Sequence, residues 1–92
     1  MSEARRRLTV VNQRGLHARA SAKFVSAVSD LPEGTSVHVA KGANKAAGGS
    51  ILGLMMLGAA KGDEIELIVA GENAEAVMAE LAAMVEDGFG EP

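Results

Sequence analysis

The sequence predicts an α+β fold in which helices cover one face of a single sheet. Segments with strand-like alternation and segments with helical periodicity follow one another as strand, helix, strand, weak strand, short helix, strand, helix. Seven short elements within 92 residues leave room for one sheet and one helical layer. Hydrophobic residues make up 48% of the chain and charged residues 23%, which is typical of globular proteins. We therefore expect residues 1–92 to form one domain.

The first strand is expected over residues 8–11, a β-rich run that the turn-forming residues 12–15 stop. Three consecutive arginines, Arg5 to Arg7, precede it. We expect them to form a frayed, solvated end, with a contact to a partner as the alternative. The apolar run after them is too short for the core of a signal peptide, so no export is expected.

A helix is expected from His17 to about Ser29, because apolar residues around Phe24 recur on one helical face. A loop with proline and glycine follows over residues 30–35. Residues 36–40 alternate as a strand, and residues 44–47 give the weakest strand prediction.

The second half begins with a short apolar helix from Ser50 to about Leu57, with Ser50 as its N-cap. Residues 64–70 form a clear strand. Asn73 is the expected N-cap of the last helix, whose apolar residues repeat at helical spacing until Gly88 ends it. This helix is the most regular amphipathic segment in the chain.

Composition excludes several classes of function. The chain has no cysteine, so disulfides, thiolate nucleophiles and cysteine-bound metals are ruled out. Its aromatic content is 2% and its net charge is −3, which argues against nucleic-acid binding. Its two histidines have no metal-ligand spacing, and its longest apolar run is too short to cross a membrane. We expect a cytoplasmic protein without metal or cofactor.

One segment, residues 15–21, has a pattern that indicates chemistry. A glycine turn leads to His17 where the helical pattern begins, and the first N–H groups of a helix form an anion site. A phosphoryl group on the ring would lie against those amides, and Arg19 would add a charge-assisted bond. The positive end of the helix should favour the neutral imidazole that a phosphoryl acceptor needs. The alternative is a plain surface histidine, which is also our interpretation of His38.

The second informative segment is residues 48–58. Leu54 and Leu57 are spaced to face the core together, which leaves Ile51, Leu52 and Met55 as an apolar patch on another side. Such a patch indicates a partner surface. Pattern alone supports equally well a helix enclosed in the core.

These two segments resemble the signatures of the HPr family, the phosphohistidine carriers of the bacterial phosphotransferase system. Residues 15–19 (Gly-Leu-His-Ala-Arg) are similar to its phosphorylation-site motif, residues 50–58 to its regulatory-serine segment, and residues 88–91 to its ending. The resemblance covers about residues 8–91. Ala20 stands where sugar-branch members have proline, so the chain looks more like the nitrogen-branch or regulatory type.

The resemblance implies an open-faced β-sandwich, with four antiparallel strands and three helices on one face. It implies that His17 accepts a phosphoryl group on Nδ1 from phosphorylated enzyme I and passes it to an EIIA-type protein, as a carrier and not an enzyme. Arg19 would assist this transfer, and the backbone of Ala18 and Arg19 would hold the phosphate. The partners would dock on Ala20 and on the Ile51, Leu52 and Met55 surface. We expect a monomer.

Ser50 matches the serine that HPr kinase/phosphorylase modifies in some lineages. A phosphate there would place negative charge within the docking patch and should repel an acidic partner. The alternative function is therefore a regulatory binding module that is controlled by phosphorylation of Ser50 and does not take part in transport.

Overall fold

Four antiparallel strands form one sheet in the computed structural model, which describes residues 2–91. Their order across the sheet is β1-β4-β2-β3, so the first and last strands of the chain lie side by side. β4 pairs with both β1 and β2, and β3 pairs with β2 at the edge. The strands are β1 (Ser2–Thr9), β2 (Ser36–Lys41), β3 (Asn44–Ala47) and β4 (Glu64–Gly71).

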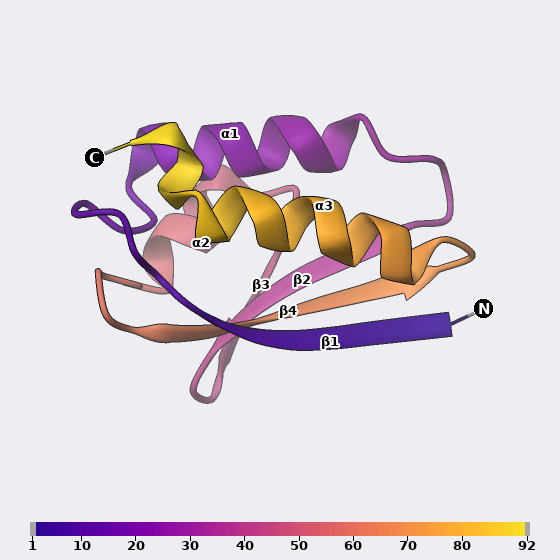
Figure 1. Ribbon diagram of the computed structural model, residues 1–92, viewed down its shortest axis with the longest axis horizontal. Helices are drawn as coiled ribbons and strands as arrows, with labels where there is room; N and C mark the ends of the chain where they lie inside the picture. Colours follow the sequence, from indigo (N-terminus) through magenta and orange to yellow (C-terminus); the bar gives the residue numbers. More distant parts are fainter. Residues whose placement is uncertain (1, 92) are drawn as a thin grey trace.

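The helices lie together on one face of this sheet (Figure 1). They are α1 (Ala18–Ser29), α2 (Ile51–Met56) and α3 (Ala74–Glu86), and a 3₁₀ turn, η1 (Gly88–Gly90), follows α3. The predicted open-faced α+β sandwich is therefore confirmed, including the weak strand over residues 44–47. Within residues 2–91, no helix is long and apolar enough to cross a membrane.

The core lies between the sheet and the helices. Alternate residues of β4, Ile65, Leu67 and Val69, point into it together with Phe24 of α1 and Leu81 of α3, and all five are almost fully buried. Leu54 and Leu57 also lie in this core, as their spacing predicted. Burying these side chains is the main force that holds the helices on the sheet.

The first strand departs from the prediction. β1 runs from Ser2 to Thr9, so it contains the three arginines, and Val10 and Val11 lie beyond its end. The reason is pairing across the sheet, because β1 is paired with β4 along its whole length, from Ser2 opposite Gly71 to Thr9 opposite Glu64. The arginines lie on this paired strand, where Arg5 contacts Glu66 at 3.3 Å and Arg7 contacts Glu64 at 3.6 Å. The frayed end predicted for these arginines is therefore wrong.

Of the two helix caps that the sequence predicted, one is confirmed. The N–H of Gly53 donates to Ser50 Oγ at 2.9 Å, so the predicted cap of α2 is confirmed. Asn73 occupies the N-cap position of α3, but its side chain makes no capping hydrogen bond. Its φ of −108° and ψ of 34° differ from the extended backbone that normally aims a capping side chain at the helix amides. The η1 turn was not predicted.

Candidate functional site

A tightly fitted loop delivers His17 to the start of α1. Gly15 has a φ of +62°, which favours glycine, and a Cβ there would collide with the carbonyl oxygen of Ala59 and lie 2.9 Å from Ala60 Cα. The next residue, Leu16, donates its N–H to the same Ala59 carbonyl at 3.0 Å. The loop before α1 therefore packs directly on the loop that follows α2, which fixes the position of His17.

His17 is the N-cap of α1, as the sequence predicted for the start of this helix. Its backbone is extended, and its Nδ1 accepts the N–H of Arg19 at 3.4 Å. This bond is long and weak, so it engages the nitrogen only slightly. The ring nevertheless places Nδ1 over the first turn of α1, where the helix dipole and unpaired N–H groups favour an anion.

The other ring nitrogen contacts a carboxylate from the far end of the chain. His17 Nε2 lies 2.9 Å from Oε1 and 2.8 Å from Oε2 of Glu91. Only 16% of the His17 side chain and 12% of the Glu91 side chain are exposed. Figure 1 places the C-terminal end of the ribbon beside the start of α1, in agreement with this contact.

Asn12 also forms a hydrogen bond with the carboxylate of Glu91. Its Nδ2 donates to Glu91 Oε1 at 3.1 Å and to the Gly15 carbonyl at 2.8 Å. Both partners are acceptors, so the orientation of this amide is determined. The hydrogen bonds from His17 and from Asn12 hold the pKa of Glu91 below its usual value, against the opposing effect of desolvation. Glu91 is therefore an ionised acceptor near neutral pH.

These contacts fix the tautomer of the neutral imidazole. A backbone N–H only donates, so Nδ1, which faces Arg19 N–H, must present a lone pair. A carboxylate only accepts, so Nε2, which faces Glu91, must carry the hydrogen. Nδ1 is therefore the ring nitrogen of His17 with the available lone pair, and it faces the first turn of α1.

Sequence reasoning missed Glu91 and Asn12. The available signal was the tail itself, in which Gly88 and Gly90 flank Phe89. All three residues have positive φ, and this turns the chain back so that Glu91 reaches the loop before α1.

Arg19 lies at this site, as predicted, together with an arginine that was not predicted. Gln13, Arg14, Arg19 and Glu91 line a cavity of about 400 Å³ next to the histidine. Both arginines are exposed, so their guanidinium groups are free to meet an incoming anion. The site thus combines an imidazole nitrogen with an available lone pair, helix amides and two cations.

The patch predicted on α2 is exposed, and it is larger than predicted. Ile51, Leu52 and Met55 are joined by Met56, and Leu52 is 68% exposed. α2 contacts α1, the helix that begins at the histidine. Ala20 is a correction, because it is 0% exposed in the core and no partner can reach its side chain.

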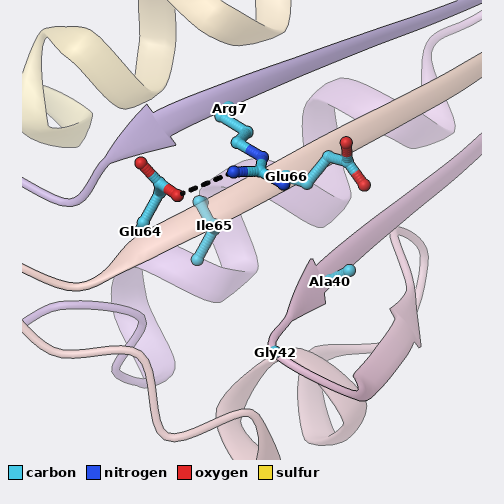
Figure 2. A pocket seen from close by; sticks show the side chains of 6 residues that line it. All are labelled: Arg7, Ala40, Gly42, Glu64, Ile65 and Glu66. Carbon is cyan, nitrogen blue, oxygen red and sulfur yellow. Dashed lines mark ion pairs between the residues drawn. The ribbon is translucent and has the colours of Figure 1, made fainter.

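A second cavity lies over the sheet and shares no residue with the histidine site. Figure 2 shows its lining residues, which come from β1, β4, β2 and the turn after β2, with Arg7 already paired to Glu64. Its volume is about 200 Å³. Within residues 2–91 no group of three His, Asp or Glu side chains is placed to hold a metal.

Comparison with known proteins gives one consistent result. Residues 4–87 match the family described as PTS HPr component phosphorylation site. The phosphocarrier protein HPr of Neisseria meningitidis serogroup A is 42% identical over 84 residues, which are 91% of this chain and 92% of that protein. The phosphocarrier protein NPr of Shewanella violacea is 34% identical over 91 residues, 99% of this chain and 98% of its own.

Solved structures agree with the sequence relatives. The crystal structure of HPr-C-His from Thermoanaerobacter tengcongensis superposes with a TM-score of 0.86 at 33% identity, covering 100% of this chain and 99% of that one. The phosphocarrier protein HPr of Bacillus anthracis gives a TM-score of 0.84 at 28% identity, covering 92% and 99%. The match over most of the chain, together with the fold, shows that this chain belongs to the HPr family of the phosphotransferase system, whose members are phosphocarrier proteins rather than enzymes.

Proposed function

We propose that this protein accepts a phosphoryl group on His17 from phosphorylated enzyme I and passes it to an EIIA-type protein. The observation that carries the proposal is the orientation of His17, whose Nδ1 presents a lone pair over the first turn of α1. The names of its relatives support the same activity, since both HPr and NPr proteins are phosphocarriers. The protein acts as a monomer in the cytoplasm and uses no cofactor.

The phosphoryl oxygens are held by the start of the helix. The N–H groups of Ala18 and Arg19 belong to the first turn of α1, where backbone donors lack partners within the helix. The guanidinium of Arg19, beside the cavity, supplies a charge-assisted bond as negative charge approaches. Partner proteins bring their own active sites, so a carrier needs no enclosed pocket of its own.

The docking surface is the exposed apolar patch of α2, which we define as Ile51, Leu52, Met55 and Met56. Methionine side chains adapt to different surfaces, which suits a carrier that must bind a donor and then an acceptor. A patch of this size supports a small and transient interface, and fast exchange of partners requires such an interface.

We further propose that the system served is a regulatory one, of the nitrogen type or an incomplete phosphotransferase system. Ala20 occupies the position where sugar-branch members have proline. The likeness to an NPr protein over nearly the whole of both chains supports this branch.

A second candidate function is a regulatory binding module controlled at Ser50, with HPr kinase/phosphorylase as the modifying partner. The observation in its favour is that Ser50 adjoins the apolar patch directly, so a phosphate there would place charge at its edge. The two functions differ in one respect, because a pure module would bind its partners equally well without His17.

The test uses purified protein, phosphoenolpyruvate and enzyme I from the same organism, followed by mass spectrometry at neutral and acid pH. We expect one phosphate that requires enzyme I, is lost in acid and maps to His17. His17→Ala should remove it while leaving the circular dichroism spectrum unchanged. Acid-labile phosphate retained by that variant would contradict the assignment of the site, and no phosphate on the wild type would favour the module.

A further inference from the structure

We infer that Met55 and Met56 form an oxidant-sensitive modification site, at which conversion to sulfoxides weakens the docking of enzyme I. The inference rests on the proposed function, because it takes the apolar patch of α2 as the docking surface. It adds to that function a reversible control that acts on methionine sulfur. The reactant is a hydroperoxide, of which hydrogen peroxide is the simplest.

The methionines within residues 2–91 differ widely in exposure. Met56 is 77% exposed and Met55 is 41% exposed, whereas Met78 of α3 is 1% exposed in the core. Met84, also of α3, is partly buried against that core. Because the chain has no cysteine, methionine thioethers are the only sulfur groups that a peroxide can meet. Within the part of the chain that the structure describes, oxidation should therefore begin on α2.

Met56 also borders a groove between α2 and the edge of the sheet. The groove has a volume of about 450 Å³, and its other lining residues include Ser50, Gly53 and residues 44–47 of β3. Hydrogen peroxide is little larger than water and can enter a space of this size. The second turn of α2 is therefore accessible to the oxidant beside the sheet as well as on its outer side.

The oxidation adds one oxygen atom to each sulfur. A lone pair of the thioether attacks one oxygen of the peroxide, so an S–O bond forms while the O–O bond breaks. The proton of the transferred hydroxyl passes to the departing hydroxide, which leaves as water. Each sulfur loses two electrons, and each peroxide molecule gains two. Methionine sulfoxide reductases reverse this change.

Sulfoxides at these two positions alter the surface of α2 and leave its core contacts in place. Leu54 and Leu57, which hold α2 in the core, are buried and contain no sulfur. The patch itself would gain two polar S=O groups beside Ile51 and Leu52. A polar group that is buried in an interface without a hydrogen-bond partner opposes binding, so docking weakens while the fold remains.

The experiment treats the whole protein with hydrogen peroxide and removes the excess with catalase. It compares the wild type with the double variant Met55→Leu/Met56→Leu and with the control Met84→Leu. Leucine keeps the apolar character and nearly the volume of methionine but has no sulfur. Mass spectrometry of peptides locates each sulfoxide, and thermal unfolding monitors the fold. A titration with enzyme I gives the Kd of each protein before and after treatment.

We expect sulfoxides on Met55 and Met56, whereas Met78 should react at least about tenfold more slowly, because its sulfur is reached only when the core opens. The Kd for enzyme I should rise about tenfold or more on oxidation of the wild type and of Met84→Leu, without a change in melting temperature. Treatment with methionine sulfoxide reductases should restore the original Kd. The double variant should show the same Kd before and after peroxide.

Three results would overturn the inference. They are equally fast oxidation of Met78, an unchanged Kd in the oxidised wild type, and an equal rise in Kd in the double variant. If the untreated wild type neither binds enzyme I nor accepts phosphate, the proposed function fails. The peptide map then still decides whether peroxide modifies the two methionines of α2 selectively.

Discussion

Replacing Gly15 by alanine should displace the loop that carries His17. Two separate effects act at this position. The first is conformational, because a φ of +62° is unfavourable for any residue with a side chain. The second is steric, because the new methyl group would collide with the Ala59 carbonyl, the acceptor of the Leu16 N–H bond.

The size of the loss follows from these effects. The left-handed backbone costs alanine about 1–2 kcal/mol. Relief of the clash by shifting backbone costs about 1–3 kcal/mol, and loss of the Leu16 hydrogen bond about 0.5–1.5 kcal/mol. We therefore expect the free energy of unfolding to fall by about 2.5–6.5 kcal/mol, a large part of the ~5–15 kcal/mol of a small domain. The melting temperature should fall by at least about 10 °C.

Gly42→Ala is the matched control. Gly42 has a φ of +59°, close to that of Gly15, but a Cβ there meets no atom within 4 Å. The free energy of unfolding of Gly42→Ala should fall only by the cost of the left-handed backbone conformation, about 1–2 kcal/mol. Chemical denaturation of the two variants, with transfer from phosphorylated enzyme I as a second assay, separates the effects. Equal losses of stability, or normal transfer in Gly15→Ala, would refute the idea that close packing on Ala59 positions His17.

Two further predictions concern Ser50 and the titration of Glu91. Ser50→Asp keeps a helix-capping side chain but adds a charge beside the apolar patch, so it should weaken binding to enzyme I, as measured in a binding titration. Ser50→Asn also caps the helix but adds no charge, so it should bind enzyme I normally. Equal binding by both variants would contradict a charge effect. The lowered pKa of Glu91 means that its contribution to stability is present above the ordinary carboxyl value of 4.5 and is lost as pH falls through the folded pKa. The difference in unfolding free energy between wild type and Glu91→Gln should therefore shrink on acidification below pH 4.5, and a constant difference would disprove the link.

Local patterns predicted the elements whose signal lies within a few residues. The alternation in β4 and the periodicity of α3 identified both elements, and the hydroxyl of Ser50 identified the start of α2. β1 was misplaced because its stabilising partners are distant in the sequence. Arg5 and Arg7 look like a charged tail until Glu66 and Glu64 of β4 are placed beside them.

The residues of the candidate site also fall into two groups, those that a local sequence pattern predicted and those that it did not. His17 and Arg19 lie within one short motif, so a single segment of sequence located them at the start of α1. Glu91 lies 74 residues from His17 along the chain, and its contact depends on η1. The positive φ of Phe89 that builds this turn is rare for a phenylalanine, so no local propensity predicts it.

The two nitrogens of His17 are held unequally, and this inequality suits a carrier. Nδ1 has one long bond of 3.4 Å to the backbone, which an arriving phosphoryl group can displace at little cost. Nε2 has short contacts to a carboxylate that Asn12 also holds, so the ring stays in place while its other nitrogen changes partner. A strong bond at Nδ1 would oppose acceptance of the phosphoryl group, and a free Nε2 would let the ring turn away from the helix. His17 can thus both accept a phosphoryl group and pass it on while only Nδ1 changes its contacts.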